Sequence, residues 1–176
     1  MSETLARAAK GDQSAFAEIV RAHQSMVFSL ALRFLRNRAT AEELAQEVFL
    51  ELFQNLSQMK SPEHMLFWLR RVATNRCIDW TRRKNTRMET ALDEANEMSV
   101  GPTDSDPALS GALQRMVAAL PEKPRLVVIL RYQEEMEPTE IAEVLGMPVT
   151  TVKSHLRRSL ASLRERLERH LGEAQR

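Results

Sequence analysis

The sequence is poor in the residues that disulfides, zinc sites and repetitive folds require. Its 176 residues include 5 Gly, 7 Pro and one cysteine, Cys77. A lone cysteine excludes a disulfide framework and a multi-cysteine zinc site, and the low Gly and Pro contents exclude collagen-like and low-complexity chains. No apolar run reaches the roughly 18 residues of a membrane span, and residues 1–9 lack a signal-peptide pattern. We therefore predict a soluble, cytoplasmic protein that does not insert into a membrane.

Catalytic patterns are missing as well. The four histidines, at positions 23, 64, 155 and 170, are scattered, and no glycine-rich phosphate loop occurs. Cys77 lies within a helical pattern and is expected to be a small buried apolar residue. The sequence thus predicts a protein that is not an enzyme and that uses no cofactor, no metal ion and no small-molecule substrate.

The formal net charge of +1 hides two charged segments. Residues 70–87 contain seven basic residues and one acid, Asp79, whereas residues 88–106 contain six acids and no base. Such a pair is typical of a polyanion-binding surface followed by a solvated tether. A solvated helix face remains the alternative interpretation.

Apolar residues recur at helical spacing along the whole chain, which predicts an all-α fold. A first helix is expected over 14–35. A second should open with a capping box at Thr40 and Glu43, with Phe49 and Phe53 on or near its apolar side, and 55–60 should be a polar loop. A third should run from Ser61 and Pro62 to about residue 83. Its expected buried residues are Leu66, Leu69, Val72, Ala73 and Ile78.

A segment rich in Ser, Gly, Pro and Asp at 99–107 divides the chain. We therefore predict two small helical domains, 1–87 and 107–176, joined by a flexible acidic linker, 88–106. The second domain should contain helices 107–119, 123–132, 138–145 and 149–171. The last two fit a helix-turn-helix, in which Ala142 permits a close crossing, Gly146 makes the turn and Val152 packs between the helices.

The start of the last helix has the composition of a DNA-reading segment. Its expected buried stripe is Val149, Val152, Leu156, Leu160, Leu163, Leu167 and Leu171. The polar residues outside that stripe are Thr150, Thr151, Lys153, Ser154, Arg157 and Arg158. Hydroxyl groups and lysine suit phosphate oxygens, and arginine can bind guanine through two hydrogen bonds. This favours DNA binding over an ordinary amphipathic hairpin.

The helix over 62–83 mixes aromatic and basic residues, a combination that suits single-stranded nucleic acid. The strongest candidates for contact are Asn75, Arg82, Arg83 and Lys84. Trp68 is expected in the core, and Trp80 lies about 120° around the helix from it. Asp79 is expected to pair with Arg76 or Arg83 on the same helix.

Four segments, in this order, resemble bacterial sigma factors of the extracytoplasmic-function subgroup, which keep only sigma regions 2 and 4. They are AEELAQEVFLELFQNL (41–56), FWLRRVATNRCIDWTRRK (67–84), LPEKPRLVVILRY (120–132) and TEIAEVLGMPVTTVKSHLRRSLASLRERL (139–167). The resemblance implies a non-enzymatic subunit that binds core RNA polymerase, directs it to promoter DNA through the −10 and −35 elements and helps to open the DNA. It also implies a cognate anti-sigma factor.

The resemblance further implies roles for single residues. Contacts to core polymerase would come from Glu43, Gln46, Glu47, Phe49 and Leu50, although Phe49 fits the bundle core equally well. The −10 element would be held by Asn55, Lys60, Arg71, Asn75, Trp80, Arg82, Arg83 and Lys84. The −35 element would be read by Thr150, Thr151, Lys153, Ser154, His155, Arg157 and Arg158. Thr150 and His155 stand where the family usually has Gly and Arg.

Two other function classes fit parts of the sequence. A conventional helix-turn-helix regulator would bind duplex DNA tightly without polymerase. A protein-binding helical adaptor would not depend on the charges of Arg82, Arg83, Arg157 and Arg158. The basic segment 70–87 argues against both.

Overall fold

A computed structural model describes the backbone of residues 2–88 and 107–174 and the side chains of 3–83 and 111–172. Within these ranges every regular element is a helix, so the predicted all-α class is confirmed. The chain divides into two compact units, Met1–Met98 (unit 1) and Ser99–Arg176 (unit 2). The predicted flexibility of the acidic linker falls on residues that lie outside the described ones.

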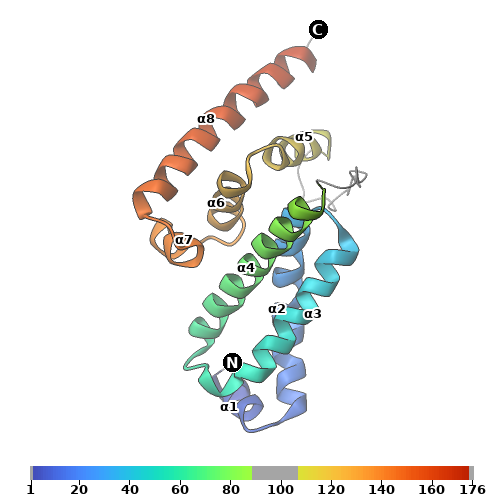
Figure 1. The fold of residues 1–176 in the computed structure, drawn as a ribbon, viewed down its shortest axis with the longest axis vertical. Helices are drawn as coiled ribbons and strands as arrows, with labels where there is room; N and C mark the ends of the chain where they lie inside the picture. The colour runs from blue at the N-terminus through green and yellow to red at the C-terminus, as the bar shows by residue number, and fades with distance from the viewer. Residues whose placement is uncertain (1, 89–106, 175–176) are drawn as a thin grey trace. The chain divides into compact units, whose positions relative to one another are not determined.

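Unit 1 is a helical bundle. It contains α1 (Ser2–Ala9), α2 (Gln13–Leu35), α3 (Arg38–Asn55), the short 3-10 helix η1 (Leu56–Gln58) and α4 (Pro62–Met88). The three long helices lie side by side, and α1 packs against α2 (Figure 1). Fully buried side chains from all three long helices form the core, among them Ile19, Leu30, Phe34, Leu52, Met65 and Leu69.

Local caps set where the helices of unit 1 begin. Ser61 Oγ accepts from the His64 amide at 3.1 Å, as predicted for the start of α4. The capping box predicted at Thr40 and Glu43 is wrong, because α3 begins at Arg38. Asn37 Oδ1 accepts from the Thr40 amide at 2.9 Å and therefore occupies the cap position one turn earlier.

Three parts of unit 1 differ from the sequence expectations. No start signal predicts α1, which forms because Leu5 and Ala8 are buried against the bundle. The expected polar loop at 55–60 contains η1, whose Leu56 is buried. In α4 the buried stripe is Met65, Leu69, Ala73 and Cys77. The predicted core residues Leu66, Trp68, Val72 and Ile78 are only half buried.

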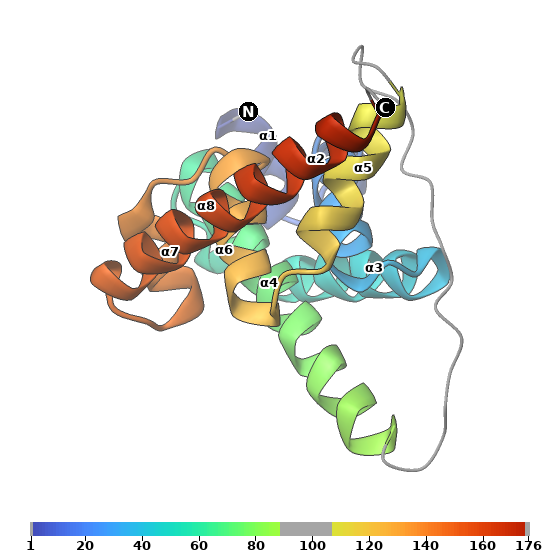
Figure 2. The ribbon, with the colours of Figure 1, turned by 90° about the horizontal axis from the view of Figure 1, so that it is seen from above.

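Unit 2 contains the four helices that the sequence predicts. They are α5 (Pro107–Ala118), α6 (Glu122–Tyr132), α7 (Pro138–Leu145) and α8 (Val149–Ala174). The long helix α8 packs against the other three (Figure 2). The core of unit 2 centres on α6, where residues 126–130 are all buried. One buried cluster contains Val128 of α6, Leu163 of α8 and Leu120 from the connection between α5 and α6.

The connection between α7 and α8 has the predicted helix-turn-helix geometry. Gly146 ends α7 in the left-handed region at φ +60°, and its amide donates to the Ala142 carbonyl. The Met147 amide donates to the same carbonyl at 3.0 Å. Ala142 and Val152 are both buried. The turn predicted at Gly146 is therefore confirmed, and the burial of Ala142 and Val152 agrees with the positions predicted for them between the two helices.

The buried stripe of α8 differs from the prediction at its middle and near its end. Val152 and Leu163 are buried, whereas Leu160 and Leu171 are 42% and 44% exposed. The other predicted members of the stripe, Val149, Leu156 and Leu167, are half buried. Ser159 is buried in place of Leu160. Seven residues after Val152 and four before Leu163, Ser159 falls closer to the line that joins those two side chains. None of the described helices combines the length and apolar character that crossing a membrane requires.

Candidate functional site

One face of α3 is exposed and carries both acidic and apolar side chains. Glu43, Gln46, Glu47 and Leu50 follow the spacing i, i+3, i+4, i+7, which places them on a single helix face. All four are exposed, and we call them the α3 surface. Phe49 is 8% exposed and belongs to the core, which was the alternative role for this residue.

Phe53 extends the α3 surface, although the apolar pattern predicts it on or near the apolar side of this helix. Leu50 and Phe53 are 60% and 49% exposed. The Phe53 ring also stands edge-on to Phe16, with ring centroids 5.1 Å apart. Two exposed apolar side chains three residues apart, outside the buried stripe, are a signal for a protein-binding surface.

One face of α4 gathers three of the residues predicted to bind the −10 element. Arg71, Asn75 and Arg82 are exposed. Their spacing of four and seven residues places them on one side of the helix, away from the stripe that begins at Met65. We call these three residues the α4 surface.

Other predicted −10 residues lie apart from this surface. Arg83 is exposed on a different side of α4, and Trp80, three residues after Cys77, is half buried along the line of the buried stripe. Asn55 Nδ2 donates to the Glu51 carbonyl at 2.8 Å, so this amide group closes the end of α3. Lys60 is exposed in the connection to α4. The side chain of Lys84 lies outside the described residues.

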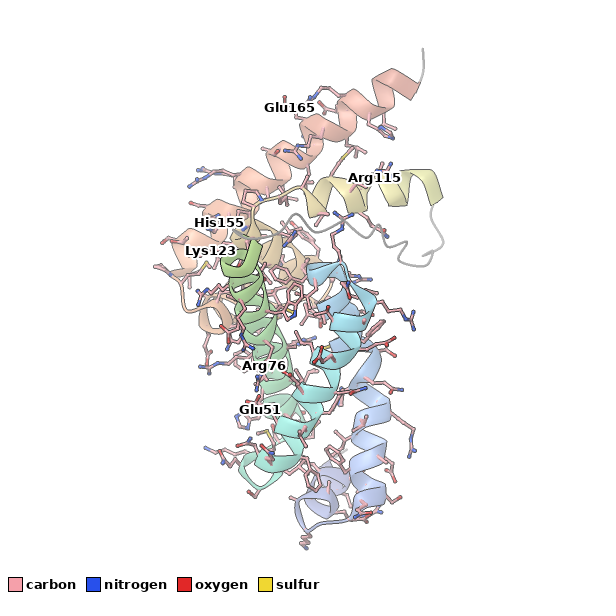
Figure 3. The ribbon with its side chains drawn as sticks, turned by 45° about the vertical axis from the view of Figure 1, so that its right-hand side comes forward. Glu51, Arg76, Arg115, Lys123, His155 and Glu165 are labelled. Atoms are coloured by element: carbon pink, nitrogen blue, oxygen red, sulfur yellow. The ribbon has the colours of Figure 1, made fainter. Side chains whose placement is uncertain are left out.

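Arg76 belongs to the basic segment, but carboxylates from α3 offset its charge. Its Nη2 donates to Glu51 Oε2 at 2.8 Å (Figure 3). Its Nη1 lies 3.4 Å from Glu47 Oε2. The Glu51 hydrogen bond, followed by the charges of Glu51 and Glu47, raises the pKa of Arg76. Asp79, predicted to pair with Arg76 or Arg83, also raises the pKa of Arg76 through its charge, but the ion pairs of Arg76 run to Glu51 and Glu47 on the neighbouring helix.

The first half of α8 presents a polar and basic face. Thr150, Lys153, Arg157 and Arg158 are exposed and Ser154 is half buried, and we call these five residues the α8 surface. Thr151 is half buried beside it. Ion pairs along α8 form further on, at Arg164–Glu168 (3.0 Å) and Arg169–Glu165 (3.6 Å).

His155 lies at the edge of the α8 surface and is half buried. Burial lowers its pKa below the usual 6.5, and the nearby charges of Arg158 and Lys123 lower it further. Figure 3 labels His155 and Lys123. The neutral imidazole therefore dominates at neutral pH. It offers one hydrogen-bond donor and one acceptor rather than a cation.

The described residues contain no group of three or more His, Cys, Asp or Glu side chains that could hold a metal ion. What they do present is an acidic and apolar α3 surface together with basic surfaces on α4 and α8. Basic helix faces of this kind bind phosphate backbones and base edges, and exposed apolar residues bind protein.

Two family profiles match the chain. Sigma-70 region 2 matches residues 19–87, and Sigma-70, region 4 matches residues 110–163. The first covers α3 and nearly all of α4, and the second covers the helix-turn-helix.

Solved structures share the fold. A CnrH chain, solved in complex with the cytosolic domain of CnrY, aligns with a TM-score of 0.66 and 24% identity over 94% of this chain and 95% of that one. The sigma factor RpoE of Bartonella quintana, solved with the anti-sigma factor NepR, aligns with a TM-score of 0.72 and 17% identity, covering 87% of this chain and 96% of that one.

Curated relatives match along most of their length. The extracytoplasmic-function RNA polymerase sigma factor SigW of Bacillus subtilis is 34% identical over 171 residues, covering 90% of this chain and 91% of SigW. SigK of Mycobacterium tuberculosis strain H37Rv, of the same subgroup, is 32% identical over 171 residues, covering 93% of this chain and 91% of SigK. The chain therefore belongs to the extracytoplasmic-function subgroup of RNA polymerase sigma factors, which direct RNA polymerase to promoters.

Proposed function

We propose that this sigma factor divides promoter recognition among three surfaces. The α3 surface binds core RNA polymerase, the α4 surface binds the −10 element and the α8 surface reads the −35 element. The observation that carries the proposal is the separation of chemistry: acidic and apolar residues on α3, basic residues on α4 and α8. The chain acts in the cytoplasm as a non-catalytic subunit.

The α3 surface is suited to a protein partner. Leu50 and Phe53 would lose exposed apolar area on binding, and Glu43 and Glu47 would meet basic side chains on the polymerase. An acidic surface would repel DNA phosphates, which separates this role from that of the neighbouring α4 surface.

The α4 surface is suited to single-stranded DNA. Arg71 and Arg82 can follow the phosphates, and the side-chain amide of Asn75 can hydrogen-bond a base edge. Lys60 adds an exposed cation in the connection that leads into α4. A base that is read by its edge must leave the stack, which is how we propose that binding also favours open DNA.

The α8 surface is suited to the major groove of duplex DNA. Arg157 and Arg158 can each bind guanine through two hydrogen bonds, while Thr150, Lys153 and Ser154 suit phosphate oxygens. The neutral His155 would contribute hydrogen bonds rather than charge. In this arrangement residues 1–87 and 107–176 act as the two recognition domains, and residues 88–106 connect them.

An anti-sigma factor is proposed as a further partner. Two proteins of the same fold were solved as complexes, one with the cytosolic domain of CnrY and one with the anti-sigma factor NepR. A cognate inhibitor that covers the α3 surface would block polymerase binding without touching either DNA-binding surface.

Co-elution with core polymerase on a sizing column, followed by selection of promoters from genomic DNA with the holoenzyme, tests the proposal. We expect a stable complex and an enriched pair of −35-like and −10-like elements. A conventional helix-turn-helix regulator would instead select duplex sites as the free protein. Failure to co-elute with core polymerase would reject the polymerase-binding role.

A further inference from the structure

We propose that Arg76 is a positioning residue that orients α4 against α3, rather than one of the cations that contact DNA. The inference rests on the proposed role of the α4 surface in −10 binding. Not every arginine of the basic segment 70–87 would then bind DNA, because Arg76 would bind a neighbouring helix instead of a phosphate.

The geometry of the contact supports a positioning role. Arg76 reaches across from α4 to two carboxylates of α3, at 2.8 Å to Glu51 and 3.4 Å to Glu47. Glu47 and Glu51 lie one turn apart, so their backbones are about 6 Å apart along the axis of α3. A planar guanidinium held by two carboxylates at different heights resists both sliding and rotation of α4.

The side chains buried next to Arg76 are small. They are Ala73, Thr74 and Cys77. The Thr74 hydroxyl is buried and has no hydrogen-bond partner. Short side chains make fewer van der Waals contacts than long ones, so the ion pair adds to the orientation that the buried Met65 and Leu69 provide.

Orientation matters because Asn75 is the next residue along the helix. One residue corresponds to a turn of about 100°, so a fixed Arg76 on the α3 side leaves Asn75 on the exposed side with Arg71 and Arg82. Loss of the ion pair would let these three residues rotate together away from the DNA.

The charge of Arg76 is also poorly available to a phosphate. Two carboxylates face one guanidinium, so the cluster is net negative and repels DNA. Glu47 belongs to the α3 surface, so a polymerase cation would compete with Arg76 for it. The shorter contact to Glu51 would still hold Arg76 in the holoenzyme.

The test measures binding of a labelled single-stranded −10 oligonucleotide to holoenzyme at saturating core polymerase, over a range of salt concentrations. We expect Arg76→Gln to weaken binding about two- to fivefold, the size of one half-exposed ion pair. The slope of log K against log salt should stay unchanged. Arg71→Gln is the matched control, and it should reduce that slope by about 0.7, as loss of one single-strand phosphate contact does.

The exchanged pair Glu51→Arg with Arg76→Glu separates the two roles further, and it is made together with Glu47→Gln so that no carboxylate faces the new glutamate. A positioning ion pair is restored by the exchange, so affinity should return to within about twofold of that of the Glu47→Gln protein. A DNA-contacting Arg76 would make the exchanged protein bind more weakly than Arg76→Gln, because a glutamate would then face phosphate. Circular dichroism of each variant checks that the helices remain folded.

The outcomes distinguish this inference from the proposed function. A holoenzyme of unmodified sequence that does not retain the oligonucleotide would reject the −10 role of the α4 surface. Retention by the unmodified protein, together with a reduced salt slope for Arg76→Gln or no loss of affinity in that variant, would overturn the positioning role alone.

Discussion

Each of the two units contains a basic helix, but the basic side chains of the two helices have different ion-pair partners. In unit 1, Arg76 is joined to Glu51 on the neighbouring helix at 2.8 Å. In unit 2, the ion pairs of α8 run along the helix itself and lie beyond the exposed Arg157 and Arg158. If the α4 and α8 surfaces bind DNA as we propose, a count of basic residues overstates the DNA contacts of unit 1 more than those of unit 2.

The two units also differ in how their buried residues are distributed over the helices. Unit 1 distributes its buried residues over α2, α3 and α4, so the helix that carries the proposed −10 surface is also part of its core. Unit 2 concentrates burial in α6, and the α8 surface lies on a helix that packs through one stripe. Substitutions should consequently affect folding and binding together in unit 1 and more separately in unit 2.

The largest expected effects come from truncating the two cores. Phe34→Ala in unit 1 and Leu130→Ala in unit 2 each remove a fully buried side chain. Each should lower the free energy of unfolding of its own unit by about 2–5 kcal/mol, because transfer and cavity terms add. Urea denaturation followed by circular dichroism should resolve which transition moves. If either substitution shifted both transitions equally, the two units would not fold independently.

Truncating the α8 surface should leave stability nearly unchanged but weaken binding. Arg157→Ala or Arg158→Ala should cost about 1–3 kcal/mol of −35 binding if the residue makes two hydrogen bonds to a base. Holoenzyme binding to promoter duplexes with single base changes measures this, and the matched base should lose its preference. A change of only a few tenths of a kcal/mol would mean that the side chain is merely solvated.

A substitution of Gly146 in the turn of the helix-turn-helix should change the stability of unit 2 through backbone strain alone. Gly146 has φ +60°, and a Cβ added there would meet nothing within 4 Å, so Gly146→Ala tests conformation without a clash. We expect a loss of about 1 kcal/mol of stability in unit 2. Gly172→Ala is the control, because that site is helical, equally open and has no positive φ. Equal effects at the two sites would contradict the strain argument.

The smallest expected effect is on pH dependence, and it compares one histidine from each unit. Burial lowers the pKa of His23 and of His155, and nearby cations, Arg70 for the first and Arg158 with Lys123 for the second, lower each further. The unfolded chain therefore takes up protons before the folded one as pH falls below about 6.5. Stability should be full above that pH and decline as pH falls through each folded pKa.

NMR titration of the two imidazoles measures these pKa values directly, and His23→Gln or His155→Gln should each reduce the acid sensitivity of its own unit. The buried Nε2 of His23 has no hydrogen-bond partner, which makes protonation there especially unfavourable. An imidazole pKa above 6.5 at either position would contradict the prediction for that unit.

Local signals in the sequence were sufficient for most helix boundaries. Pro138 and Gly146 bracket α7 as predicted, and Ser61 starts α4. The predicted start of α3 was wrong because Asn37 and Thr40, three residues apart, are both good N-cap residues. Only the folded backbone shows which of them is used. Helix α1 was beyond prediction because its stability comes from contact with α2 rather than from a local signal.

The site was less predictable where contacts span long distances along the chain. Asp79 is the neighbour that spacing suggests for Arg76, yet Glu51, 25 residues away, is the partner. Leu160 and Ser159 differ by one position, and the packing of unit 2 decides which is buried. The exposed residues of α8, with Asn75 and Arg82 of α4, were predicted from the pattern of residues, whereas the α3 surface and Arg71 were predicted only through the resemblance to sigma factors.

Run-off transcription is the decisive experiment for the three proposed surfaces. Core RNA polymerase is supplied with this chain on a template whose promoter was selected by the holoenzyme. We expect a defined transcript that requires the chain and that is weakened by Arg71→Gln and by Arg157→Ala. Tight binding of the free chain to duplex DNA at physiological salt, with no chain-dependent transcript, would contradict this expectation.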